Sequence, residues 1–167
     1  MSKVYEATHI ADMDAVDLSN AIKAKKVSCC EVMEAFLARI DQVNPAFNAI
    51  VSLQDREGLM LQAGERDRQL AQGEWLGWMH GFPQAPKDLA ETAGILTTLG
   101  SPILKDNIPS QDAIIVERMK RSGGIVIGKT NTPEFGLGSH TYNNVFGITR
   151  NAYDPSKTAG GSSGGAA

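Results

Sequence analysis

Two segments of this sequence carry side chains that could take part in proton transfer. Residues 160–165 read GGSSGG, which places the hydroxyls of Ser162 and Ser163 among glycines that can adopt positive φ and approach a ligand closely. Lys87 precedes Asp88 in a segment that also contains prolines and apolar residues. Burial there would disfavour the ammonium form of Lys87 and lower its pKa, and a neutral lysine can act as a base.

Each of these segments also has a simpler interpretation when it is considered alone. A Gly/Ser run such as residues 160–165 resembles a flexible linker. A lysine beside an acidic residue is more often a solvated surface pair than a base, and Asp88 would then be the partner of Lys87. The local sequence therefore leaves the role of both segments open.

A third segment, residues 123–130, matches the phosphate-binding pattern GxxxxGKT. Such a loop needs a strand before its first glycine and a helix directly after its lysine. Here a helical pattern precedes Gly123, and the apolar run at 125–127 between the glycines is typical of a strand. We therefore predict that the chain binds no nucleotide and that Lys129 is structural.

The composition is typical of a soluble globular protein with one domain. Of the 167 residues, 42% are hydrophobic and 21% charged, and the formal net charge is -3. We find no apolar stretch of membrane-spanning length, no secretory signal, and only the adjacent cysteines Cys29 and Cys30. We expect a cytoplasmic protein without disulfide, metal or cofactor, and with no direct nucleic-acid or membrane partner, because charges of both signs are interspersed.

The N-terminal part of the sequence predicts helices. One is expected over about 14–24, and a second should begin at Ser28, whose hydroxyl can cap the Glu31 amide while Glu31 reaches back. The pair Asn44-Pro45 should end this second helix. The segments that follow are a short β-type run at 48–53 and a polar helix over about 54–72.

The C-terminal part predicts helices and strands in alternation, which is typical of the α/β class. A helix over about 112–121 should lead into a buried strand at 125–127. The side chains of that helix expected to face inward are Ile115, Val116 and Met119. Thr132 should cap a short helix that begins at Pro133, and the composition beyond Gly136 predicts loop.

Six motifs together resemble the amidase signature family in their order and approximate spacing. They are HGFP at 80–83, KD at 87–88, TTLGS at 97–101, GKTNTPEF at 128–135, TRN at 149–151 and GGSSGG at 160–165. The resemblance implies an α/β fold, a mixed β-sheet flanked by helices, of which this chain would be the N-terminal part. It also implies cleavage or transfer of amides by a Ser-Ser-Lys triad.

The resemblance assigns roles to individual residues of this chain. It makes Lys87 the general base and Ser162 the bridging serine, which follows a cis peptide and relays a proton between lysine and nucleophile. It gives Ser163 a supporting role and places Ser139 in the lining of the site. Lys105 lies in a similar local sequence, but at a position where the family has a variable surface segment.

The resemblance also implies that part of the machinery lies outside this sequence. In the family, the acylated serine and the oxyanion hole follow the GGSSGG motif, so we expect both beyond Ala167. Residues 1–167 would then be the N-terminal part of a single amidase domain. We expect 1–73 to be mainly helical scaffold and 74–167 to be an incomplete α/β catalytic segment, and we expect the isolated chain to be inactive.

The leading interpretation of the parent protein is a serine amide hydrolase that acts on a small-molecule amide, with a homodimer as one assembly open to it. Two alternatives remain. The first is the glutaminase-type A subunit of a tRNA-dependent amidotransferase, which would bring protein and tRNA partners. The second is a non-enzymatic truncated remnant. The sequence does not identify the amide.

Overall fold

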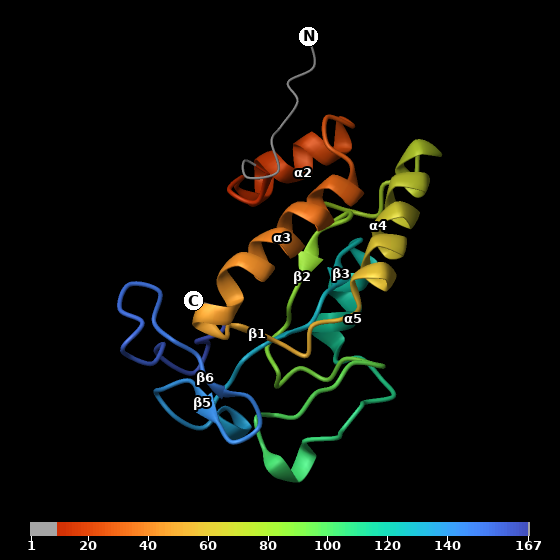
Figure 1. Cartoon of the computed structure of the whole chain (residues 1–167). Coiled ribbons are helices and arrows are strands. Elements are labelled where there is room, and N and C mark those ends of the chain that lie inside the picture. Colours follow the sequence, from red (N-terminus) through yellow and green to blue (C-terminus); the bar gives the residue numbers. More distant parts are fainter. Residues whose placement is uncertain (1–9, 167) are drawn as a thin grey trace. The chain divides into compact units, whose positions relative to one another are not determined.

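The computed structural model of this chain describes residues 10–166, which form two compact units. The first unit takes in residues 10–41, 55–84 and 118–126, and the second takes in residues 42–54, 85–117 and 127–166. Each unit thus combines segments that are far apart in the sequence, and Figure 1 shows the course of the chain through them. The division into a helical part, 1–73, and a catalytic part, 74–167, stays a prediction.

The first two described helices begin close to their predicted starts, and a side chain caps each of them. Helix α2 (Ala15–Lys23) follows Asp14, whose carboxylate accepts hydrogen bonds from the backbone of Val16 and Asp17. Helix α3 (Cys29–Phe47) follows Ser28, whose hydroxyl accepts the Glu31 amide at 3.0 Å. The Glu31 carboxylate accepts the Ser28 amide at 2.7 Å in return, so the predicted capping box is confirmed.

Helix α3 does not end at Asn44-Pro45 as predicted, but continues to Phe47. A proline in the last turn removes only one backbone donor, and other contacts of Asn44 hold this turn. Its carbonyl accepts the Asn48 amide at 2.7 Å, and its side-chain oxygen accepts the amides of Ala49 and Ile50. Those side-chain bonds pair the backbone amides just beyond the helix and so hold the exit of the chain from α3.

A carboxylate on helix α4 (Arg56–Ala71) binds the start of helix α3. Asp67 accepts the backbone amide of Cys29 at 2.6 Å and that of Cys30 at 3.1 Å. Both cysteines are free thiols; Cys29 is buried and Cys30 is half-buried. Burial and the nearby Asp67 raise the pKa of both thiols, that of Cys30 to about 11. Asp67 therefore supplies acceptors to two amides that the helix itself leaves unpaired.

Replacing Asp67 with alanine should lower the free energy of unfolding of this chain by about 1–2 kcal/mol, because two amides at a helix N-terminus lose a charged acceptor. Urea unfolding followed by circular dichroism measures this loss. The exposed Asp106 is the matched control, and its alanine variant should change stability by less than about 0.5 kcal/mol. Equal losses in the two variants would contradict a capping role for Asp67.

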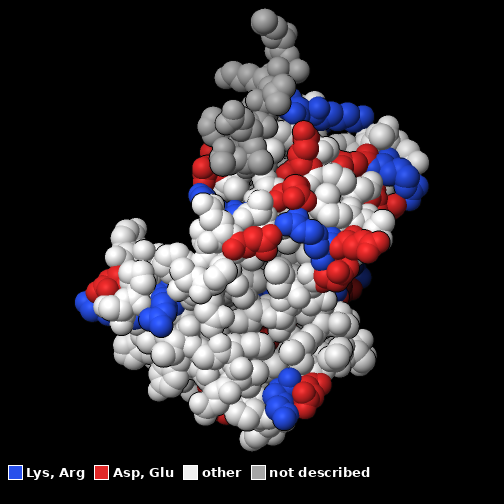
Figure 2. Space-filling view, viewed as in Figure 1, with Lys and Arg blue, Asp and Glu red and all other residues white. Residues whose placement is uncertain are grey.

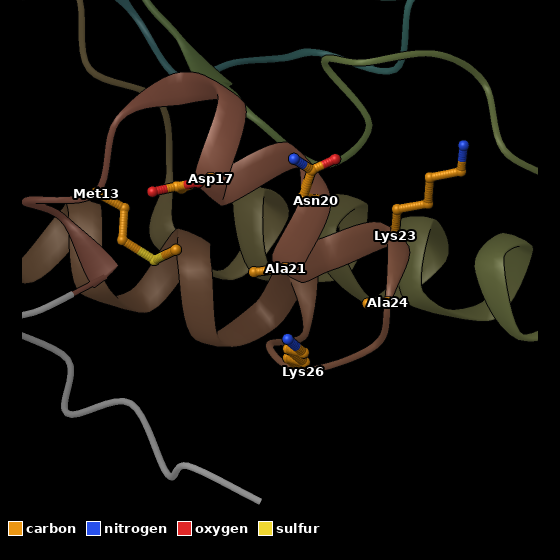
Figure 3. A pocket seen from close by; sticks show the side chains of 7 residues that line it. All are labelled: Met13, Asp17, Asn20, Ala21, Lys23, Ala24 and Lys26. Carbon is orange, nitrogen blue, oxygen red and sulfur yellow. The ribbon is translucent and has the colours of Figure 1, made fainter.

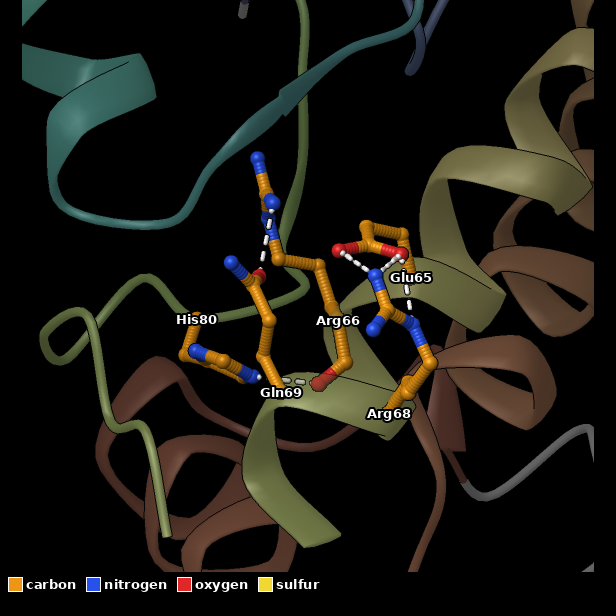
Figure 4. Close-up of polar contacts among 5 residues, drawn as sticks. All are labelled: Glu65, Arg66, Arg68, Gln69 and His80. Carbon is orange, nitrogen blue, oxygen red and sulfur yellow. Dashed lines mark hydrogen bonds and ion pairs between the residues drawn. The ribbon is translucent and has the colours of Figure 1, made fainter. Parts of the chain in front are cut away.

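A buried histidine ties helix α4 to the segment after it (Figure 4). His80 is fully buried; its Nδ1 accepts the Leu76 amide at 3.3 Å, and its Nε2 lies 2.9 Å from the carbonyl of Arg66. Because a backbone amide can only donate, Nδ1 is the acceptor and Nε2 carries the hydrogen donated to Arg66. The Arg66 guanidinium donates to the carbonyl of Gly123 and to Gln69.

Three pairs of short strands form among the described residues, one parallel and two antiparallel. They are β1 (Ile50–Val51) with β4 (Lys129–Thr130), β2 (Pro83–Gln84) with β3 (Ile125–Val126), and β5 (Tyr142–Asn143) with β6 (Gly147–Ile148). The pair β2 and β3 is the parallel one, with Pro83 opposite Ile125. Helices combined with both kinds of strand pairing confirm the α/β class.

Three further local predictions differ from the structure. Of the three residues on helix α5 (Ile114–Arg121) predicted to face inward, Val116 is buried, Met119 is half-buried and Ile115 is exposed. Thr132 caps no helix: its hydroxyl donates to the carbonyl of Pro133, which is itself extended and precedes the 3-10 turn η2 (Glu134–Gly136). The segment beyond η2, predicted as loop, includes the β5–β6 hairpin.

A second 3-10 turn, η1 (Pro102–Leu104), precedes helix α5 in the sequence.

Charged side chains of both signs lie next to one another on the face shown in Figure 2. Within the first unit, Arg56 contacts Glu34 and Asp41 at 2.9 Å each, and Arg39 contacts Asp12 at 2.8 Å. These are exposed pairs of small energetic weight. No helix within residues 10–166 has the length and apolar character needed to cross a membrane.

Candidate active site

Lys87 and Ser162 meet in the second unit although 75 positions separate them in the sequence. The Lys87 Nζ atom donates a hydrogen bond to the Ser162 Oγ atom at 2.8 Å. Lys87 is half-buried, and burial lowers the pKa of its ammonium group. The structure thus brings together the two residues that the sequence predicts as base and bridging serine.

The backbone around Lys87 is held against strand β4. Lys87 forms a parallel bridge with Thr130, in which the Thr130 amide donates to the carbonyl of Pro86 at 3.1 Å. The Asp88 amide donates in turn to the Thr130 carbonyl at 3.0 Å. Pro86 contributes only its carbonyl here, so its missing amide costs this bridge nothing. These bonds fix the lysine main chain in an extended conformation.

The glycine-rich loop around Ser162 is packed against residues 139–141. The peptide bond between Gly161 and Ser162 is cis, and the Gly161 amide donates to the carbonyl of Ser139 at 2.6 Å. A Cβ atom at the buried Gly164 would overlap the hydroxyl of Thr141. This close approach requires glycine, so the loop is a packed element and the flexible-linker interpretation is wrong.

The other two predicted site residues, Ser163 within this loop and Ser139 beside it, make no hydrogen bond to Lys87. Ser163 is exposed, and within the described part of the chain its hydroxyl makes no hydrogen bond. Ser139 is exposed and borders a hollow of about 340 Å³. The other residues that line this hollow are Pro133, Glu134, Leu137, Gly138, His140, Tyr142, Asn143 and Asn144.

Sequence reasoning missed the position of Asp88, which it treated as a solvated partner of Lys87. Asp88 is fully buried, and its carboxylate bonds to Thr98 and Gly100. No local signal could have located it, because the residues that bond its carboxylate lie 10 and 12 positions further along the sequence.

The two competing lysines have different environments. Lys129 is fully buried and donates to the carbonyl of Ala90 and, at 2.7 Å, to the hydroxyl of Thr92, which supports a structural role. Lys105 is exposed. The phosphate-loop pattern is also excluded by geometry, because helix α5 precedes its first glycine and strand β4, instead of a helix, contains its lysine.

Another surface hollow among the described residues is lined by neither Lys87 nor Ser162. The hollow of about 670 Å³ lies on helix α2 and its flanks, and Figure 3 shows the side chains around it, which include Asp17, Asn20 and Lys23. It contains none of the predicted site residues. Within residues 10–166, no three His, Cys, Asp or Glu side chains lie close enough together to hold a metal ion.

Comparison with known proteins identifies the family. The family model described as Amidase matches residues 31–167. The chain belongs to the amidase family. The A subunit of a glutamyl-tRNA(Gln) amidotransferase from Acidothermus cellulolyticus is 46% identical over 153 residues, which are 92% of this chain and 30% of that protein. An acylamidase from Rhodococcus erythropolis is 41% identical over 151 residues, which are 90% of this chain and 31% of that protein.

A solved structure supports the same assignment and confirms the amidase signature fold. A bacterial aryl acylamidase of the amidase signature family superposes with a TM-score of 0.85 and is 34% identical. The match covers 92% of this chain and 32% of that protein. The chain therefore corresponds to one part of the amidase fold, and it spans only 30% and 31% of the two sequence relatives.

Proposed function

We propose that these residues supply the general base and the proton relay of a serine amide hydrolase. The observation that supports this most strongly is the 2.8 Å hydrogen bond between the Lys87 amine and the Ser162 hydroxyl in a chain of the amidase family. Burial of the lysine favours the neutral amine that a base must be. Neutral Lys87 would accept the Ser162 proton while Ser162 accepts the proton of the nucleophile.

The proposed reaction passes through an acyl-enzyme. The oxygen of a nucleophilic serine forms a bond to the carboxamide carbon, and its proton moves through Ser162 to Lys87. The lysine ammonium then returns a proton through Ser162 to the leaving nitrogen as the C–N bond breaks, which releases ammonia or an amine. Water attacks the acyl-enzyme by the same relay and frees the acid, so protons and electrons balance over the cycle.

The remaining parts of the machinery are also proposals. The acylated serine and the oxyanion hole are proposed to lie outside these 167 residues, which would form the N-terminal part of one amidase domain. Ser163 would support the loop, and Ser139 would border the bound substrate. The substrate would be a small-molecule amide, the enzyme would be cytoplasmic and need no cofactor, and a homodimer stays compatible with these proposals. Alone, residues 1–167 would show no amide turnover.

A second candidate function is the glutaminase reaction of a tRNA-dependent amidotransferase. The relative from Acidothermus cellulolyticus, which is the A subunit of such an enzyme, supports this candidate by its 46% identity. In that case the amide would be glutamine, and the ammonia would pass to a second protein that binds tRNA. The chemistry of Lys87 and Ser162 would be the same in both cases.

Ammonia or amine release by the full-length protein that contains these residues tests the function. The protein is incubated with glutamine, an aliphatic carboxamide or an anilide, and product is measured over time. We expect release from at least one of the three, with glutamine alone supporting the amidotransferase candidate and the other two supporting the amidase. No turnover of any of the three by folded protein would contradict the proposed function.

A further inference from the structure

The carboxylate of Asp88 is enclosed by a single short turn. The Thr98 amide lies 3.1 Å from each carboxylate oxygen, and the Thr98 hydroxyl donates to Oδ2 at 2.7 Å. The Gly100 amide lies 3.4 Å from Oδ2 and donates to the Thr98 hydroxyl at 3.0 Å. Because the hydroxyl accepts from Gly100, its own hydrogen is available for Asp88, and each of these groups around the carboxylate is a donor.

The backbone of this turn is shaped to receive an anion. Leu99 has φ of 53° and Gly100 has φ of 67°, two successive left-handed conformations that direct neighbouring amides to the same side. The Leu99 amide also bonds the Asp88 carbonyl at 3.1 Å, so side chain and main chain of Asp88 are both held. Thr98 and Asp88 are fully buried. The chain fills this anion-binding turn with its own carboxylate.

The anchored carboxylate fixes the residue beside it. Lys87 lies in the bridge to Thr130, and Asp88 begins the turn that the Ala90 amide closes on the Lys87 carbonyl at 2.9 Å. The amine of Lys87 bonds Ser162, while the carboxylate of Asp88 bonds Thr98 and Gly100. The strand bridge to Thr130 holds the main chain between them. Because the Asp88 carboxylate is bonded to Thr98 and Gly100, it forms no salt bridge with Lys87.

We propose that Asp88 is a positioning residue for Lys87: held by Thr98 and Gly100, it sets the place of the lysine amine beside Ser162 and does not serve as its counter-ion. This inference rests on the proposed role of Lys87 as the general base. A positioning role and a solvated Lys-Asp pair can be distinguished, because they predict opposite changes in the pKa of Lys87 when the carboxylate charge is removed.

Charged groups on the segments around Lys87 could also influence its titration. On the described segments that pack against it, strand β4 carries Lys129, and the loop 160–166 carries no ionisable side chain. The Lys129 ammonium bonds the carbonyl of Ala90 and the Thr92 hydroxyl, and its charge acts on Asp88. Burial raises the pKa of Asp88, and the bonds from Thr98 and Gly100 oppose that rise. Burial is the cause that lowers the pKa of Lys87.

The titration of Lys87 in the isolated chain tests the inference without any need for amidase activity. The chain is labelled with ¹³C at the lysine Cε atoms, and Lys87→Arg identifies the Lys87 signal by its loss. We expect Asp88→Asn and Thr98→Val to raise the pKa of Lys87 toward the ordinary value of about 10.4, because the lysine leaves its half-buried place. Thr98→Ser keeps the hydroxyl and should retain the pKa of the unchanged chain.

A counter-ion role for Asp88 predicts the reverse. Loss of the carboxylate charge would then lower the pKa of Lys87, and Thr98→Val would leave it unchanged; either result, or no shift in Asp88→Asn, overturns the inference. Asp106→Asn is the matched control, because Asp106 follows a lysine too but is exposed. If Asp88→Asn fails to fold, the Thr98→Val and Thr98→Ser pair decides.

In the full-length enzyme, misplacement of the base should act on kcat. We expect Asp88→Asn to lower kcat for amide hydrolysis about 10- to 100-fold with KM little changed, the size of effect that a small displacement of a catalytic group produces. A rise in KM alone would contradict positioning of the base. An unchanged Lys87 titration in a full-length enzyme that is active would reject the role of Asp88 and leave the proposed function standing.

Discussion

Replacing Lys87 with alanine in the full-length protein should lower kcat/KM for amide hydrolysis about 10²- to 10⁴-fold, the usual contribution of a positioned general base. The 2.8 Å bond to Ser162 would be lost, and no other described lysine lies within hydrogen-bond distance of that hydroxyl. Release of ammonia under saturating and limiting substrate measures both kcat and KM. Lys105→Ala, which alters an exposed lysine in a similar local sequence, is the control and should behave as the unchanged enzyme.

The unchanged enzyme and Lys87→Ala should also differ in how their rates depend on pH. The base must be neutral, so the rate of the unchanged enzyme should rise with pH as Lys87 loses its proton. Burial lowers the pKa of Lys87, and the rise should therefore be centred below the ordinary lysine value of about 10.4. Lys87→Ala should lack this limb of the profile. Near-normal rates in Lys87→Ala, or a profile that keeps the limb, would reject the lysine as the base.

Replacing Ser162 with alanine should have an effect of similar size, about 10²- to 10⁴-fold on kcat/KM. The lysine amine would remain, but the hydroxyl that carries the proton between nucleophile and base would be absent. Ammonia release again measures the loss. Ser163→Ala is the matched control, since Ser163 is exposed and its hydroxyl bonds no described residue, and we expect a smaller loss there. A larger loss in Ser163→Ala than in Ser162→Ala would exchange the proposed roles of the two serines.

The pairing of Lys87 with Ser162 was predictable only from the whole set of motifs. From the local sequence, Lys87 reads as a surface lysine paired with Asp88, because sequence adjacency looks like spatial pairing. In the structure Lys87 bonds Ser162 instead, and the donors for Asp88 come from Thr98 and Gly100. Those donors lie 10 and 12 positions away, and no local pattern indicates that they will enclose a carboxylate.

The fold shows the same contrast between local and distant contacts. The start of helix α3 was predicted correctly because both partners of its capping box, Ser28 and Glu31, lie within one turn. The β-type run predicted from residue 48 misses the left-handed backbone of Asn48, whose side chain donates to the carbonyls of Phe146 and Ile148, 98 and 100 positions away. Composition alone also missed the β5–β6 hairpin, whose strands are only two residues long on each side.

The most direct test of the central claim, that Ser162 relays protons and is not itself acylated, is to map the residue that a serine-directed fluorophosphonate modifies. The reagent forms a bond from serine oxygen to phosphorus with loss of fluoride, and peptide mass spectrometry locates the adduct in the full-length protein. We predict an adduct on a serine outside residues 1–167, formed more slowly in Lys87→Ala and in Ser162→Ala. An adduct on Ser162 itself would contradict the account.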